Sequence, residues 1–443
     1  MHLDRFREEL FSFLRIPSVS ARPEFDADTR RAGEWVVAAL RRAGLSAELA
    51  ETDGHPLALG EWRGAGPDAP TLLIYGHYDV QPPEPIELWT TPAFEPTIRD
   101  GRIYARGSAD DKGQVFLHLK ALELLLAEDG SLPVNVVVLI EGEEEVASPN
   151  LLPFLEANRA RLAAHTVLIS DSGMFAPDLP SLLVSLRGLA YFEVRVRSSS
   201  TDLHSGLYGG AVPNAATELA RILATLHDDR GRVTIPGFYD RVMDWEDEAI
   251  QAVRSLPFDE EGFLAEAGVE APAGESGRST LERLWMRPTC EVNGLLSGYT
   301  GQGAKTVLPA HAMAKVSFRL VPDQDPTAVA TLFRAHLEKV ASPTVTVEVE
   351  SLHGGRPWRA RPQGAFFEAA RGALREVFGR DPVLVGEGGS IPIVADFERV
   401  LGAPCLLMGF SYPGANLHAP DEWFPVEQVE RGIAALMAFY RRL

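Results

Sequence analysis

Three short apolar segments constrain the fold of this chain more than any other feature. Residues 71–75, 134–140 and 166–169 are almost wholly apolar, and each leads directly into histidine or acidic side chains. Their length and composition predict strands buried on both faces. A helical pattern at 31–43 precedes the first segment, and another at 115–128 lies between the first and the second; Gly44 is a predicted C-terminal cap of the earlier helix. This order predicts an α/β fold in which helices cover a parallel-rich sheet.

The middle of the chain has a different pattern. Residues 191–197, 314–320 and 344–349 alternate polar and apolar side chains, which predicts a sheet with one solvated face. Helical patterns at 214–226 and 327–340 complete a small α+β sandwich. Within 228–286 the only clear helical pattern is 240–255.

The chain turns apolar again after Asp381 and delivers His418 in a loop rich in Asn, Pro and Gly. A site that draws on both ends of the chain requires the C-terminal segment to return to the first domain. We therefore predict one domain from residues 1–186 and 386–443, interrupted by an inserted domain at 187–385.

Charge and composition narrow the classes of function. The chain has 42 basic and 62 acidic residues, a net charge of −20, which argues against a nucleic-acid partner. No segment approaches the roughly 18 apolar residues of a membrane span, and the first ten residues mix both charge signs. We expect a cytoplasmic protein whose two distant cysteines, Cys290 and Cys405, are free thiols.

The polar side chains after the apolar segments suit metal binding. His77 and Asp79 point to the same side of an extended segment, where the carboxylate could hold the imidazole of a metal ligand. For an isolated Gly-His pair, a hydrogen-bonded histidine that ends a strand is the favoured interpretation, but the other motifs reverse this preference. Asp110 and Asp111 precede a helix, so one could cap it while the other binds metal. Asp110 is the candidate to bridge two cations.

The acids after the second strand and the histidine near the end complete the set. Of Glu143, Glu144 and Glu145, one could ligate metal and another could accept a proton from water. Asp171 ends the third strand, and His418 supplies a second imidazole. Two histidines and three carboxylates suit two divalent cations, zinc first and manganese or cobalt next. A nucleophile elbow and a Cys-His pair are both absent from the sequence, so a covalent mechanism has little support.

In this order, the motifs Gly-His-x-Asp, Asp-Asp-Lys-Gly, Glu-Glu, Asp and Asn-Leu-His-Ala-Pro resemble the two-zinc metallopeptidases. That family includes carnosinase, carboxypeptidase G, acetylornithine deacetylase and succinyl-diaminopimelate desuccinylase. The resemblance spans nearly the whole chain and is closest to the branch of carnosinase and cytosolic non-specific dipeptidase. Segments 76–82, 202–206, 303–309, 318–322 and 387–392 carry the closest similarity.

The resemblance implies a role for each matching residue. His77, Asp110 and Asp171 would hold one metal, while Asp110, Glu145 and His418 would hold the other. Glu144 would be the general base and Asp79 the partner of His77, and the Asp110–Asp111 peptide bond would be cis. The inserted domain would be a lid that also forms a homodimer, with His204 reaching the partner subunit's site to polarise the scissile carbonyl. The expected ligands of the substrate's carboxylate are Arg319, Thr306, His353 and Ser390.

These observations predict a cytoplasmic, homodimeric dipeptidase that needs two metals and acts on short peptides with a free C-terminal carboxylate. An N-acyl amino acid deacylase of the same chemistry is the nearest alternative. A non-catalytic metal-binding scaffold and a calcium-binding dimer fit less well, since every expected residue is present and calcium prefers an all-oxygen shell. One departure from the branch is Val146-Ala147-Ser148-Pro149 after Glu145. A one-residue shift of register there would name Glu143 as the base.

Overall fold

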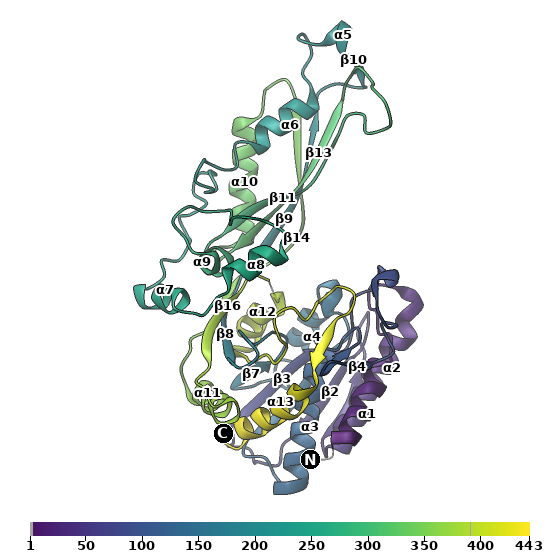
Figure 1. Ribbon diagram of the computed structural model, residues 1–443, viewed down its shortest axis with the longest axis vertical. Helices are drawn as coiled ribbons and strands as arrows, with labels where there is room; N and C mark the ends of the chain where they lie inside the picture. Colours follow the sequence, from purple (N-terminus) through teal and green to yellow (C-terminus); the bar gives the residue numbers. More distant parts are fainter. Residues whose placement is uncertain (1–2, 390) are drawn as a thin grey trace. The chain divides into compact units, whose positions relative to one another are not determined.

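The computed structural model describes residues 3–389 and 391–443. The chain forms two compact units. Unit 1 comprises Met1–Val184, Ala360–Val385 and Ile393–Leu443, and unit 2 comprises Ser185–Arg359 and Gly386–Pro392. Unit 2 thus interrupts unit 1 along the chain (Figure 1). None of the described helices is long and apolar enough to cross a membrane.

The sheet of unit 1 has the strand order β1-β2-β6-β3-β7-β17-β8. Its four central strands β6, β3, β7 and β17 are parallel, and the flanking pairs are antiparallel. Every residue of β3, β6 and β7 is buried, as the apolar segments predict. The bounds are β1 Ser46–Ala50, β2 Leu57–Trp62, β3 Thr71–His77, β6 Asn135–Glu141, β7 Thr166–Ile169, β8 Ser181–Leu186 and β17 Cys405–Leu407.

Helices cover this sheet and enclose the largest hydrophobic core. Helix α3 contacts α1, α2 and α13, and α13 also contacts α11. Helix α3 ends at Gly130, whose φ of 71° is left-handed. The helices are α1 Leu3–Leu14, η1 Pro23–Phe25, α2 Asp26–Arg42, η2 Ile86–Leu88, α3 Lys112–Asp129, η3 Glu144–Val146, α4 Leu151–Ala157, α11 Ala365–Phe378, α12 Pro392–Leu401 and α13 Val426–Tyr440. A small antiparallel sheet, β18-β5-β4, joins Trp423–Pro425, Arg102–Tyr104 and Thr97–Arg99.

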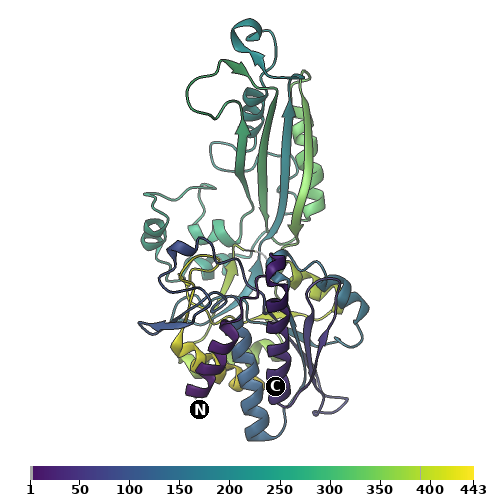
Figure 2. The ribbon, with the colours of Figure 1, turned by 90° about the vertical axis from the view of Figure 1, so that its right-hand side faces the viewer.

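Unit 2 is built on an antiparallel sheet in the order β11-β13-β9-β14, whose strands lie side by side in Figure 2. One face packs against α6 and α10 through side chains such as Phe192, Phe318 and Phe333. The other face carries polar side chains, as the alternating pattern predicts. The bounds are β9 Gly188–Arg197, β11 Thr289–Ser297, β13 His311–Leu320, β14 Thr346–Gly355, α6 Ala215–Leu223 and α10 Pro326–Val340.

The remaining elements of unit 2 are short. β10 and β12 pair at the end of the unit where β13 begins. The helix predicted at 240–255 is shorter, because Glu246 is extended and α7 begins only at Asp247. The bounds are β10 Leu203–His204, α5 Ser205–Tyr208, α7 Asp247–Arg254, α8 Glu260–Glu266, α9 Thr280–Trp285 and β12 Val307–Leu308; β15 Trp358–Arg359 and β16 Val383–Glu387 pair with β8.

The α/β class with a parallel-rich sheet is confirmed. The division into units differs from the predicted boundaries in three segments: residues 185–186 and Gly386–Pro392 belong to unit 2, and Ala360–Val385 belongs to unit 1. Helix α11 lies in the last of these segments and packs its apolar residues against α13, so its amphipathic face completes the core of unit 1.

Candidate metal centre

His77 is the last residue of β3, and its imidazole is held on both sides. The ring is fully buried. Its Nδ1 lies 3.1 Å from the carbonyl oxygen of Asp79 and 3.3 Å from Oδ1 of Asp79. Its Nε2 lies 3.0 Å from Oδ1 of Asp110. Contact of Nδ1 with Asp79 directs Nε2 toward Asp110, the arrangement expected of a metal-binding histidine.

Asp110 stands between the two histidines. Its second oxygen, Oδ2, lies 2.9 Å from Nε2 of His418, so the two carboxylate oxygens face two different imidazoles. The loop that carries Asp110 precedes α3, and its peptide bond to Asp111 is cis. An aspartate whose two oxygens face two imidazoles is well placed to be shared between two cations.

Glu145 and His418 lie on one side of Asp110. Nε2 of His418 is 3.3 Å from Oε2 of Glu145, and Gln81 donates to the same oxygen at 2.8 Å. Asp110, Glu145 and His418 together offer three ligand atoms within 4.8 Å of one another. The structure therefore brings together the predicted second set.

Asp171 follows β7 and lies on the other side. Its Oδ2 is 3.9 Å from Nε2 of His77. Here the geometry also includes Asp111, because His77, Asp111 and Asp171 form a second group of possible ligands. Oδ2 of Asp111 accepts a hydrogen bond from the His77 backbone at 3.3 Å, whereas the buried Oδ1 has no hydrogen-bond partner among the residues described. An unsatisfied buried carboxylate oxygen fits a site built to hold a cation.

Asp79 also positions the acidic turn. Its Oδ1 accepts the backbone N–H of Glu144 at 3.2 Å, and its Oδ2 accepts that of Glu145 at 3.1 Å. Glu143 instead accepts hydrogen bonds from the His55 backbone and the Asn150 side chain. The side chain of Glu143 is thus engaged in hydrogen bonds within the protein. Asp79, which also contacts His77, instead holds the backbone of Glu144 and Glu145.

Six carboxylates surround the two histidines, so the site carries a strong excess of acidic groups. The carboxylates belong to Asp79, Asp110, Asp111, Glu144, Glu145 and Asp171. Burial raises the pKa of Glu144 well above its usual value, and burial and then Asp110 raise the pKa of Glu145 to about 9. Burial also tends to raise the pKa of Asp110, but hydrogen bonds from His418 and His77 outweigh it and lower that pKa. Divalent cations would relieve this repulsion, so the donor set fits them.

Two residues that the sequence interpretation missed fix the Asp110 loop. Glu422 is fully buried and accepts the backbone N–H groups of Gly107, Ala109 and Asp110 at 3.0, 2.8 and 3.1 Å. Arg106 pairs with the same carboxylate at 2.7 Å. Glu422 follows His418 by four residues, but nothing in that polar loop distinguishes it from a solvated acid.

The predicted substrate residues lie in unit 2, in two separate places. Arg319 on β13 and His353 on β14 belong to the polar face of the main sheet, where His353 packs edge-on against Tyr191 at 5.0 Å. His204 and Thr306 lie together at β10 and β12, where the Ser205 backbone donates to the Thr306 carbonyl at 3.1 Å. Ser390 lies outside the described residues.

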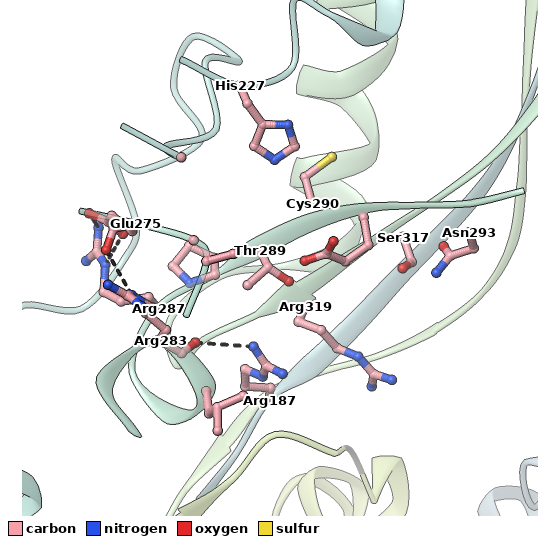
Figure 3. Close-up of a pocket in the computed structure, with 16 residues that line it drawn as sticks. Arg187, His227, Glu275, Arg283, Arg287, Thr289, Cys290, Asn293, Ser317 and Arg319 are labelled. Atoms are coloured by element: carbon pink, nitrogen blue, oxygen red, sulfur yellow. Dashed lines mark hydrogen bonds and ion pairs between the residues drawn. The ribbon is translucent and has the colours of Figure 1, made fainter. Parts of the chain in front are cut away.

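Arg319 also lines a cavity of about 620 Å³ within unit 2. Figure 3 shows Arg187, Arg283, Arg287 and Arg319 around it, together with Glu275. Such a volume lies within the range of small-molecule sites.

A parallel-rich sheet whose strand ends and adjoining loops bring together six carboxylates and two histidines defines the class of protein as a metal-dependent hydrolase. Residues 73–442 match peptidase family M20/M25/M40, so the chain belongs to that family. The predicted resemblance is confirmed, and membership implies divalent metal ions and a small peptide substrate.

One relative and two solved structures illustrate the similarity. The Cys-Gly metallodipeptidase dug1 of Schizosaccharomyces pombe is 30% identical over 456 residues, which cover 99% of this chain and 96% of that protein. The M20 family metallo-carboxypeptidase Sso-CP2 of Sulfolobus solfataricus is 33% identical with a TM-score of 0.87, covering 98% of both chains. Human carnosine dipeptidase 1 is 29% identical with a TM-score of 0.84, covering 100% of this chain and 96% of the other.

Proposed function

We propose that the protein is a two-metal dipeptidase that cleaves dipeptides or short peptides with a free C-terminal carboxylate. The observation that carries this proposal is the placement of the Asp110 oxygens, one 3.0 Å from His77 and the other 2.9 Å from His418. A single carboxylate facing two imidazoles suits two cations with a shared ligand. The names of the relatives, a Cys-Gly metallodipeptidase and a carnosine dipeptidase, support the substrate class.

His77, Asp110 and Asp171 would hold one cation, and Asp110, Glu145 and His418 would hold the other. The proximity of Asp111 to the first group makes it a neighbouring acid of that site. Imidazole and carboxylate donors favour zinc, with manganese or cobalt as alternatives. When bound, such cations lower the pKa of water and polarise a carbonyl group.

Glu144 would accept the proton of the attacking water and return it to the leaving amine. Burial raises the pKa of its carboxyl group, which makes the carboxylate a stronger base and a better carrier of the proton between the two steps. Asp79 would keep both His77 and Glu144 in place, because it contacts the imidazole of one and the backbone of the other.

Unit 2 would bind the substrate. Arg319 offers a planar fork of N–H donors that matches a carboxylate, and His353 lies on the same face of the sheet. With Thr306 and Ser390, these residues would hold the C-terminal carboxylate. His204 would stabilise the developing oxyanion of the scissile carbonyl.

A homodimer would bring these groups together. Strand β13 runs from His311, beside the β10–β12 pair, to Arg319 near its other end. At about 3.3 Å per residue, the two ends are roughly 26 Å apart, whereas a dipeptide spans only about 7 Å. This separation supports the proposal that a second copy supplies His204 to the dipeptide that Arg319 binds.

Apolar side chains in unit 2 support association of two copies. Leu207 on α5 is 78% exposed, and Leu295 and Leu296 on the edge strand β11 are 63% and 57% exposed. The two leucines of β11 are adjacent on an edge strand, so a second copy would find an apolar surface beside an unpaired strand edge. We also propose that the protein acts in the cytoplasm, where its buried, unpaired Cys290 and Cys405 would remain reduced.

A substrate panel tests the proposed activity. Protein stripped with chelator and reloaded with zinc or manganese would be given neutral dipeptides, N-acetyl amino acids and N-succinyl amino acids. We expect metal-dependent release of amino acids from the dipeptides. Acyl removal with little dipeptide turnover would instead identify an N-acyl amino acid deacylase, whose carboxylate site could be the same.

A further inference from the structure

Helix α3 buries two polar side chains on one face. Gln114 and His118 are 1% and 2% exposed, and their spacing of four residues places them on the same side of the helix. Gln114 donates to the Ala109 carbonyl at 3.0 Å and accepts the Phe410 backbone N–H at 2.8 Å, so it holds the loop that carries Asp110. His118 has no part in the metal centre described above, and its burial needs a separate explanation.

The imidazole of His118 lies between two hydroxyl groups. Its Nε2 is 2.7 Å from Oγ of Ser170, and its Nδ1 is 3.3 Å from the hydroxyl oxygen of Tyr440. Burial lowers the pKa of His118 to about 3, so the ring is neutral, with one donor and one acceptor nitrogen. Because a hydroxyl group can donate or accept, both nitrogens are satisfied. The shorter contact, with Ser170, leads toward the metal centre.

Ser170 connects the end of strand β7 to Asp171. It is 2% exposed and follows the last residue of that strand. Its carbonyl oxygen accepts the backbone N–H of Ser172 at 2.8 Å, which turns the chain around Asp171. Oδ2 of Asp171 lies 3.9 Å from Nε2 of His77. The hydrogen bond to His118 thus anchors the residue immediately before a candidate metal ligand.

A structural role alone does not require a histidine at this position. His118 lies between Leu117 and Leu119 on the buried part of α3, where an apolar side chain would need no hydrogen-bond partner. Replacing both members of a buried polar pair by apolar groups can leave the stability of a protein nearly unchanged. A neutral histidine bonded to a buried serine is therefore better explained by its effect on the adjoining Asp171.

We propose that His118 is a positioning residue: through its hydrogen bond to Ser170 it holds the carboxylate of Asp171 in place for a metal ion. This inference rests on the proposed function, in which Asp171 is a ligand of only one of the two cations. Loss of the contact between His118 and Ser170 should therefore weaken the binding of one cation and spare the other. Groups that support a metal ligand typically change metal affinity by about 10- to 100-fold when they are replaced.

Zinc titrations of the stripped protein against a competing chelator measure the two dissociation constants directly. In H118L, which cannot bond Ser170, we expect one constant to rise about 10-fold or more and the other to keep its wild-type value. H118Q places an amide group near the position of Nε2 and should recover part of the affinity. S170A removes only the hydroxyl group and should reproduce the effect of H118L, so it decides the matter if H118L fails to fold.

Two further variants assign the effect to one site. In D171N the carboxylate of that site is already lost, so the addition of H118L should cause no further loss of zinc affinity. H336L is the matched control, because His336 on α10 of unit 2 is also buried and its Nε2 lies 2.9 Å from the hydroxyl group of Thr225. This control should leave both constants unchanged.

The outcomes separate this inference from the proposed function. If H118L and S170A keep both wild-type constants, the positioning role is wrong while the two-metal proposal stands. The same conclusion follows if they weaken both sites equally, or if H336L changes zinc binding as H118L does, because the loss is then a general effect on folding. If the wild type binds fewer than two zinc ions, the proposed function and this inference are both overturned.

Discussion

Asp110 and His418 lie 308 residues apart in the chain, yet Oδ2 of the aspartate is 2.9 Å from Nε2 of the histidine. The other oxygen of Asp110 is 3.0 Å from His77. This relationship joins a loop before α3 to a loop near the C-terminus. It explains why unit 1 needs both ends of the chain, and it provides the basis for the following predictions.

Replacing Asp110 should affect both metals. In D110N one ligand oxygen becomes an amide nitrogen, so we expect zinc affinity to fall at least about 100-fold at the shared position and turnover to be lost. D171N should weaken one metal only. Metal content after equilibrium dialysis distinguishes them, and retention of two tightly bound ions by D110N would argue against a shared ligand.

Glu144 should be needed for turnover but not for metal binding. We expect E144Q to keep its metal content and lose about 10²–10⁴ in kcat, since an amide cannot accept the proton of water. E143Q is the control, because Glu143 contacts His55 and Asn150 instead. The assignment fails if E143Q loses the activity and E144Q keeps it.

The pH dependence of stability should reveal Glu145 in the metal-free protein. Its pKa of about 9 lies above the ordinary value of 4.5, so between these values the folded state binds more protons than the unfolded chain. The free energy of unfolding must then decrease as pH rises through this window. Melting temperatures of chelated wild type should fall between about pH 5 and pH 9, and E145Q should show a shallower fall. Equal slopes of melting temperature against pH in the wild type and E145Q would contradict a raised pKa at Glu145.

Metal binding should release protons for the same reason. Zinc requires the ionised carboxylate, so loading near pH 7.5 must displace a proton that Glu145 holds. Calorimetry in two buffers of different ionisation enthalpy measures the number of protons released when zinc binds. We expect at least one proton per subunit in the wild type and fewer in E145Q.

Glu422 should stabilise the loop that carries Asp110. E422Q leaves the buried Arg106 without a counter-charge, which should reduce the free energy of unfolding by about 3–5 kcal/mol. Urea denaturation of the metal-free protein checks this value. E51Q is the control, because its pair with Arg30 is exposed and should contribute little to the free energy of unfolding.

If His204 acts in the partner subunit's site, two inactive variants should complement each other. H204A lacks the oxyanion group, and E144Q lacks the base. A mixed dimer contains one site with both groups intact, so random co-assembly should restore about a quarter of wild-type activity. Activity that stays at the level of the separate variants would mean that each site is complete within one chain.

The sequence predicted the features that depend on local pattern. Strands β3, β6 and β7 are recognisable because each is short and wholly apolar, and the side chains after them fall at one sheet edge. The orientation of Asp111 was not predictable, because it depends on the backbone path of its loop. Glu422 and His118 escaped notice because each contacts a segment hundreds of residues away in the chain.

The most direct test of a two-metal peptidase is a titration of stripped protein with zinc while dipeptide hydrolysis is measured. We predict negligible activity without metal and a rise that saturates at two equivalents of zinc per subunit. Full activity at one equivalent, or undiminished activity in the stripped protein, would contradict the account.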